Sequence, residues 1–106
     1  MRGIIYCNTL ETGLAEFKKI IEDYNNIGIT CDKPIVSTST SQARVTFNNG
    51  DDWIVVRATE GSARGHACNV AYIDRMIPDD FVETIIMPTI KAFPYQAYRY
   101  YNWGTW

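Results

Sequence analysis

The sequence has little of what marks membrane, secreted or strongly nucleic-acid-binding proteins. Its longest apolar runs, such as residues 70 to 73 and 84 to 87, fall far short of the roughly 18 to 20 residues that cross a bilayer. No basic-then-apolar segment opens the chain, so we expect no secretory signal. Ten basic and twelve acidic side chains give a net charge of -2, which argues against a general electrostatic grip on nucleic acid. We expect a soluble cytoplasmic protein with no membrane association.

Cysteine is also sparse. Cys7, Cys31 and Cys68 make an odd count at wide spacings, unlike the dense, even pattern of a small disulfide framework. Reduced thiols in a cytoplasm are the simplest interpretation. A zinc site that added His66 is the alternative, since Cys and His are the usual zinc ligands. The spacing fits no zinc finger, so buried cysteines acting as small hydrophobes are favoured and no metal is expected.

The 106 residues are 46% hydrophobic and contain no low-complexity tract, which predicts one ordered domain over residues 1–106. A β-rich run at 3 to 7 ends at Asn8 and Thr9, either of which can cap a helix. Apolar residues then recur every three or four positions from 10 to 24, with Glu16 among the polar residues between them, and this predicts an amphipathic helix.

Further strands and one further helix are predicted downstream. The pair "NG" between β-rich runs predicts a hairpin that pairs residues 44 to 47 with 53 to 57, after a connecting segment with room for one short strand. A buried strand ends at Asp74, and Pro78 opens a helix over 78 to 91 that Pro88 should kink or break near its end. A last strand is predicted over 97 to 103. Together these elements predict an α/β domain: a central mixed sheet with a hairpin and two packed helices, in which the strands at 3 to 7 and 70 to 74 are parallel neighbours.

Four segments follow one another in a distinctive order: "RVTFNNGDDWIVV", "SARG", "VAYID" and "IPDDFVETIIMP". In order and spacing they resemble the ATPase core of the large terminase subunit of tailed bacteriophages, the motor that packages DNA. That family has a hairpin of the "I-F-NG-S-I" type, an "RG" loop, a hydrophobic strand ending in Asp-Glu, and an "IP-x-x...P" segment. The resemblance covers roughly residues 3 to 92. It implies a phage origin and an ATPase-type fold in which Asp74 corresponds to the metal-holding acid.

The chain lacks two parts of that family's core that ATP hydrolysis needs. The phosphate-cradling loop G-x-x-x-x-G-K-[ST] occurs nowhere in the chain. The family's water-orienting glutamate follows the strand-ending Asp, and here that position is Arg75. We therefore expect neither independent ATP hydrolysis nor a bound cofactor. We favour a structural role for Asp74 over a role as metal ligand: an acid at the end of a strand that caps the next turn or pairs with Arg75 or Arg64.

Binding residues are predicted at two places. Arg64, Gly65 and His66, with Asp74 and Arg75, form the candidate ligand site, because a glycine-flanked arginine can meet a phosphate through its guanidinium and nearby amides; an ordinary solvated loop is the alternative. The aromatic C-terminus is the candidate interface of a homo-oligomer. Base stacking there is the alternative, but the negative net charge favours packing and self-association. The proposed interface residues are Tyr98, Tyr100, Trp103 and Trp106.

Two functions fit these observations. The first is a small non-catalytic phage protein that binds a protein partner or a nucleotide-like ligand, for example to counter a bacterial defence system in the infected host's cytoplasm. The second is an accessory or split component of DNA packaging that contacts DNA or a partner bearing the phosphate loop. A metal-dependent nuclease would require Asp74, Asp79 and Asp80 to converge, and the last two fit a helix's first turn more simply.

Overall fold

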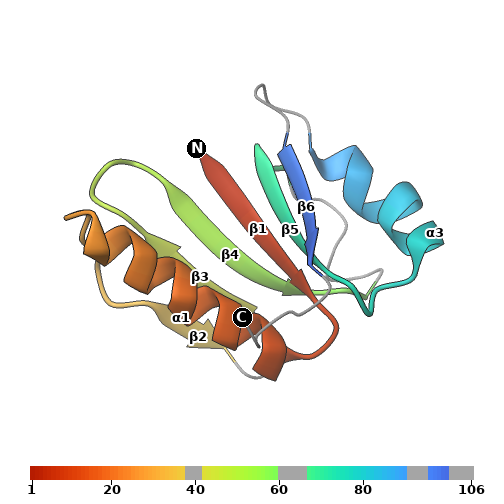
Figure 1. The fold of residues 1–106 in the computed structure, drawn as a ribbon, viewed down its shortest axis with the longest axis horizontal. Helices are drawn as coiled ribbons and strands as arrows, with labels where there is room; N and C mark the ends of the chain where they lie inside the picture. Colours follow the sequence, from red (N-terminus) through yellow and green to blue (C-terminus); the bar gives the residue numbers. More distant parts are fainter. Residues whose placement is uncertain (38–41, 60–66, 91–95, 101–106) are drawn as a thin grey trace.

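The computed structural model describes residues 1–37, 42–59 and 67–90, together with the backbone of 96–100. These segments form a six-stranded mixed sheet in the order β2-β3-β4-β1-β5-β6, with helical segments on both faces (Figure 1). The elements are β1 (Arg2–Cys7), α1 (Leu10–Asn26), β2 (Ile35–Ser37), β3 (Gln42–Thr46), β4 (Asp52–Arg57), β5 (Val70–Asp74), α3 (Asp79–Phe81), η1 (Val82–Ile86), η2 (Met87–Thr89) and β6 (Gln96–Tyr100). This is the α/β fold class that the sequence predicts.

The sheet has a parallel centre and an antiparallel extension. β1 lies between β4 and β5 and is parallel to both, which confirms the predicted neighbourhood of the first strand and the strand before Asp74. β3 pairs antiparallel with β4, and β2 antiparallel with β3, so the predicted hairpin is also confirmed. Gly50 turns the hairpin with a φ of 93°, a left-handed conformation that glycine adopts without steric cost.

α1 follows the predicted pattern with one exception. Thr9 is its N-cap, and the Thr9 hydroxyl accepts a hydrogen bond from the Thr12 amide at 3.4 Å. Glu16, predicted on the polar face, is instead only 4% exposed. It lies three residues after Gly13 and four before Ile20, both of which are buried, so at 3.6 residues per turn it falls inside the packed stripe.

The predicted helix over 78 to 91 is present as a shorter helical segment over residues 79 to 89, and its geometry changes near Pro88 as expected. The segment runs as a short α-turn, a π-turn and a 3₁₀-turn in succession (α3, η1 and η2), with Pro78 as the cap before it. Pro88 has no N–H to give a carbonyl four residues back, and its ring crowds that carbonyl. The Thr84 hydroxyl also donates to the Asp80 carbonyl, which offers the backbone a side-chain partner inside the turn.

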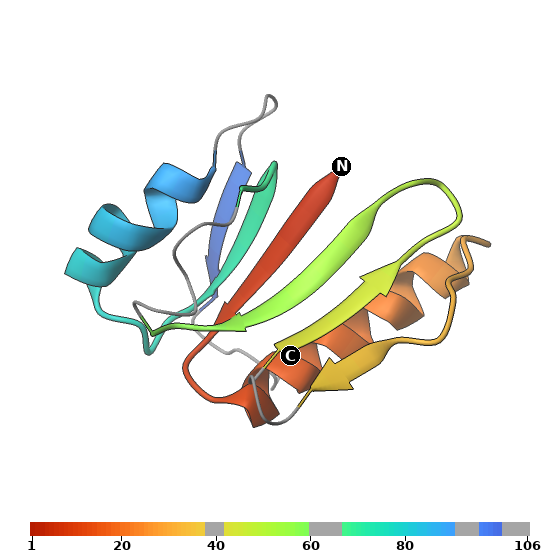
Figure 2. The same ribbon diagram turned by 180° about the vertical axis from the view of Figure 1, so that it is seen from behind.

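α1 and the α3–η2 segment cover opposite faces of the sheet, and they do so over different strands (Figures 1 and 2). α1 packs on β1, β3 and β4, and a Cβ added at Gly13 would lie 2.7 Å from Cys7 Sγ and from Val55 Cγ1. On the other face Ile77, Val82 and Ile86 pack against β1 and β5. The hydroxyls of Tyr6 and Thr89 meet at 2.8 Å and tie η2 to β1.

The predicted strand over 97 to 103 is present in part. β6 spans Gln96–Tyr100 and pairs parallel with β5, while residues 101 to 103 lie outside the described part of the chain. No helix in the described ranges is both long and apolar enough to span a bilayer.

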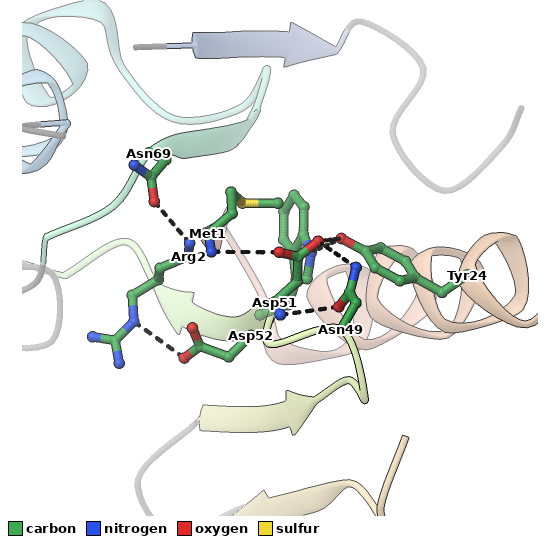
Figure 3. A network of polar contacts seen from close by, with 8 residues as sticks. Met1, Arg2, Tyr24, Asn49, Asp51, Asp52 and Asn69 are labelled. Carbon is green, nitrogen blue, oxygen red and sulfur yellow. Dashed lines mark hydrogen bonds and ion pairs between the residues drawn. The ribbon is translucent and has the colours of Figure 1, made fainter. Parts of the chain in front are cut away.

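A polar cluster joins the hairpin to α1 and the first strand (Figure 3). Asp51 Oδ2 accepts hydrogen bonds from the Tyr24 hydroxyl at 2.9 Å and from the side-chain amide of Asn49 at 3.1 Å. The Met1 α-amino group lies 3.4 Å from the other carboxylate oxygen, Oδ1. Trp53 donates its indole N–H to the Tyr24 hydroxyl at 3.1 Å. The cluster fixes the hairpin turn against the helix.

Acid should weaken this cluster. Partial burial raises the pKa of the Asp51 carboxyl, but the hydrogen bonds from Tyr24, Asn49 and the α-amino group outweigh burial and hold its pKa below the usual 3.8. A carboxyl with a lowered pKa in the folded state stabilises the fold above its unfolded pKa and loses that contribution as pH falls through its folded pKa. Chemical denaturation from pH 5 to pH 2 should therefore show a stability loss below about pH 4 that is smaller in Asp51→Asn. Equal pH slopes in both proteins would contradict this role.

Candidate functional site

The predicted site corner lies where β1 and β5 end together. The two strands are parallel neighbours with Tyr6 beside Ile73, so their carboxyl ends meet at one edge of the sheet. Asn8 and the start of α1 follow β1, and Asp74 is the last residue of β5. In open α/β sheets this edge is the usual place for a ligand. Its chemistry therefore decides whether the corner can act as the resemblance implies.

The Asp74 carboxylate is engaged by the chain itself. Asp74 is 3% exposed. Its Oδ2 accepts a hydrogen bond from the backbone N–H of Asn8 at 3.3 Å and from the Thr12 hydroxyl at 3.5 Å. Its Oδ1 accepts a hydrogen bond from the backbone N–H of Met76 at 3.0 Å. The bond to Met76 caps the turn after β5, as the favoured interpretation of this acid expects. One buried side chain thus holds together the β1–α1 junction and the turn that leads to α3.

The first turn of α1 has a negative neighbour in place of a free anion site. The amides of a helix N-terminus ordinarily attract phosphate, because they carry the positive end of the helix dipole. Here the Thr12 hydroxyl bonds both the Thr9 carbonyl and Asp74, and the Asn8 amide points to Asp74 as well. A phosphate that approached this turn would meet a carboxylate already in place.

Cys7 lies at the same corner but is poorly suited to nucleophilic chemistry. It is fully buried, and its Sγ lies 3.5 Å from the Val56 carbonyl oxygen. Burial, with the nearby Asp74 charge as a second cause, raises the pKa of the Cys7 thiol to about 11. The thiolate is the reactive form, so this thiol is unreactive at neutral pH.

The other predicted site residues are distributed as follows. Arg75 is exposed directly after Asp74, and Asp79 and Asp80 are exposed at the start of α3. Within the described ranges, no three His, Cys, Asp or Glu side chains are grouped to hold a metal ion. Tyr98 and Tyr100 belong to β6, of which the backbone alone is described. The remaining predictions lie outside the described residues: Arg64, Gly65, His66, Trp103 and Trp106.

A second site, which the sequence did not indicate, lies on the sheet face opposite α1. In the strand register Ile54 is beside Arg44, which is beside Ile35, and these three side chains share that face. The α3–η2 segment covers this face over β1 and β5, and no other described helix covers it over β2 to β4 (Figure 2). A groove of about 310 Å³ remains there, with Ile54 and Val56 in its floor.

Two arginines stand at the rim of this groove, which we call the arginine groove. Arg2 Nε donates to Asp52 Oδ2 at 3.1 Å (Figure 3), and Arg44 Nη2 donates to the same oxygen at 3.3 Å. The two arginine side chains are 40% and 54% exposed. Each guanidinium has five N–H donors, and two cations face one carboxylate, so the rim keeps an excess positive charge and donors that can reach an incoming acceptor. This arrangement suits an anion with an apolar body.

Sequence reasoning missed the groove because its two arginines are 42 positions apart. Arg2 precedes the first β-rich run, and Arg44 begins the first strand of the predicted hairpin. The hairpin register places Arg44 beside Ile54, and the parallel pairing of β1 with β4 places Arg2 beside Asp52. The sequence predicted the hairpin without its register, and the second pairing depends on which strand lies next to β1.

The fold and the corner together define an α/β protein with a mixed sheet and a buried acid at the end of a central strand. Comparison with known proteins found no matching family model and no matching curated protein. Among solved structures, the chain is similar to the large terminase of a thermophilic bacteriophage in complex with ADP, with a TM-score of 0.60 and 11% identity over 92% of this chain. A second structure of that terminase gives a TM-score of 0.56 and 13% identity.

This likeness is one of fold. The chain spans about a quarter of the terminase chains that it matches, 25% and 24% of their lengths. The resemblance that the motifs predicted is therefore confirmed at the level of the fold alone. The terminase's activity does not follow from it, because at this identity a shared fold hosts different functions.

Proposed function

We propose that this chain is a non-hydrolysing binding protein of phage origin on a terminase-like fold, and that it binds a nucleotide-like anion in the arginine groove. The observation that carries the loss of hydrolysis is the engagement of Asp74. Its carboxylate accepts hydrogen bonds from the backbone amides of Asn8 and Met76, and it shares the Thr12 hydroxyl proton with the Thr9 carbonyl. With Arg75 next to it, the corner has an acid committed to structure and a cation where hydrolysis needs a second acid.

The ligand class follows from the chemistry of the groove. Ligand sites are mostly apolar hollows with a few well-placed polar groups, and a volume of about 310 Å³ is at the small end of their range. Ile54 offers an apolar surface for a planar base, and Arg2 and Arg44 offer paired donors for a phosphate. A mononucleotide or cyclic nucleotide has both parts.

Isothermal titration calorimetry with ATP, ADP, AMP and cyclic nucleotides tests this assignment. We expect at least one of them to bind without being hydrolysed, and Arg44→Ala to weaken that binding at least about tenfold, since a hydrogen bond to a charged group contributes about 1.5–3 kcal/mol. Arg57→Ala is the matched control, because Arg57 is exposed at the end of β4 and outside the groove lining.

Three results would count against the proposal. Magnesium-dependent ATP turnover would contradict the loss of hydrolysis. Equal weakening by Arg44→Ala and Arg57→Ala would contradict the groove. An absence of heat with every nucleotide would leave the version in which a host or phage protein is the partner, as expected for a product that counters a bacterial defence system in the host cytoplasm.

A second candidate is a split or accessory component of DNA packaging. It is favoured by one observation: the chain spans only about a quarter of the terminase chains that share its fold. A second polypeptide that bears a phosphate-binding loop would then complete the domain. Co-expression with the products of neighbouring genes tests it. A stable complex with such a product is expected, and the absence of both that complex and salt-dependent DNA binding would exclude this candidate.

A further inference from the structure

The sheet ends at β2, a short strand with apolar side chains in solvent. Ile35 is 69% exposed and Val36 is 48% exposed, although both lie within a strand. β2 pairs with β3 on one side, and no described strand pairs with its other side. An edge strand that also exposes apolar side chains is a template for a further strand, and soluble proteins usually protect such edges unless they use them.

The two exposed side chains lie on opposite faces of the sheet. Val36 is beside Ala43 in the register, on the face that α1 covers, and Ile35 is beside Arg44 on the other face. Next to Val36 a groove of about 490 Å³ opens between β2 and α1, with Leu14, Phe17 and Ile21 among its lining residues. This groove, which we call the edge groove, continues the apolar surface of β2 onto the helix.

The rim of the edge groove carries charges of both signs. Glu11 and Lys18 line it from α1, seven residues and about two helical turns apart, with Leu14 between them. α1 runs antiparallel to β1 (Figure 1), and β2 runs parallel to β1 because two antiparallel pairings separate it from β4. A twofold rotation about an axis that passes through Val36 perpendicular to the sheet would reverse the directions of both β2 and α1. It would bring the acidic end of one edge groove to the basic end of the other.

We propose that β2 pairs antiparallel with β2 of a second copy of this chain, which joins two six-stranded sheets into one continuous sheet. Val36 packs against Val36 of the partner subunit on the helix side. On that side α1 lies antiparallel to the α1 of the second copy, with Glu11 facing Lys18 of the partner subunit. A second copy fits better than an unrelated chain, because a twofold interface requires a surface that complements itself. The edge groove meets this requirement, since the rotation places apolar Val36 against Val36 and acidic Glu11 against basic Lys18.

Light scattering coupled to size-exclusion chromatography tests the proposal. The wild-type chain should elute at twice its monomer mass, and Val36→Lys should raise the dimer dissociation constant at least about tenfold, since the lysines of the two copies would meet at the twofold axis. Ile27→Lys is the control: Ile27 is 74% exposed at the C-cap of α1 and does not line the edge groove, so this variant should stay dimeric. A monomeric wild-type protein, or equal masses for both variants, would overturn the proposal.

A charge exchange keeps the test valid if Val36→Lys fails to fold. Lys18→Glu alone should weaken the dimer by placing acids opposite each other, and the double variant Glu11→Lys with Lys18→Glu should restore it. Restoration supports the antiparallel arrangement of the helices. If the single and double variants dimerise as the wild type does, or if both fail to dimerise, the arrangement is wrong. β2 also lines the arginine groove through Ile35, but nucleotide binding is tested by Arg44→Ala and the dimer by Val36→Lys on the opposite face, so the two proposals can fail independently.

Discussion

Replacing Trp53 with alanine is expected to lower the free energy of unfolding by about 3–5 kcal/mol, the range for deleting a buried aromatic side chain. Trp53 is 3% exposed in the cluster between α1 and the sheet. Its ring lies against Gly3 so closely that a Cβ there would be 2.3 Å from Cε3, and it packs against the Tyr72 ring at a centroid distance of 4.9 Å. The substitution therefore leaves a cavity that three strands border.

Urea denaturation followed by circular dichroism measures this effect. Trp53→Phe is the matched control: it keeps most of the apolar volume and loses the hydrogen bond to Tyr24, so its loss should be well below that of the alanine variant. A cost under about 1 kcal/mol for Trp53→Ala would mean that the ring is not packed as described.

Substitution of Asp74 should have the second large effect on the free energy of unfolding. The direction of that effect distinguishes an acid that serves the fold from one that binds a metal. Asp74→Ala should cost about 2–4 kcal/mol, because the backbone amides of Asn8 and Met76 lose their acceptor, while the Thr12 hydroxyl keeps the Thr9 carbonyl. Asp74→Asn should cost less but still destabilise, since the amide group keeps one acceptor oxygen and turns a donor toward other donors. Thermal and urea unfolding, each with and without Mg²⁺, measure both variants.

A metal-binding acid would behave differently. Removing a carboxylate kept for a ligand often leaves stability unchanged or raised, because functional groups are held at a cost to the fold. Stabilisation of the wild-type chain by Mg²⁺ that disappears in Asp74→Asn would therefore indicate a metal site. A destabilised Asp74→Asn with no Mg²⁺ effect on either protein is the result expected for an acid that serves the fold.

Local patterns predicted much of this architecture. The "NNGDD" turn indicated the hairpin, because an Asn-Gly pair between β-rich runs admits few other structures, and Gly50 does take the left-handed conformation there. The apolar residues at intervals of three and four positions from Leu10 onward predicted α1 nearly to its C-terminal end. Two short apolar runs linked by long connections were correctly placed as parallel neighbours.

What the sequence did not predict depends on contacts between distant segments. Glu16 looked polar and exposed, yet tertiary packing buries it. Pro88 was expected to kink or break its helix, but the π-turn that precedes it was not predicted, and there the Thr84 hydroxyl donates to the Asp80 carbonyl. The arginine groove needs the pairing of β1 with β4 as well as the hairpin register, and no local pattern encodes the first of these.

The position of a bound nucleotide shows whether the ligand site of this chain lies in the arginine groove, as proposed, or at the strand-end corner. Amide proton and nitrogen chemical shifts can be followed by NMR during titration with ADP. A nucleotide in the arginine groove should produce shifts that cluster at Arg2, Arg44 and Ile54 and that weaken in Arg44→Ala. Shifts that cluster at Asn8, Thr12 and Asp74 and require Mg²⁺ would contradict the proposal, because the corner would then be the ligand site.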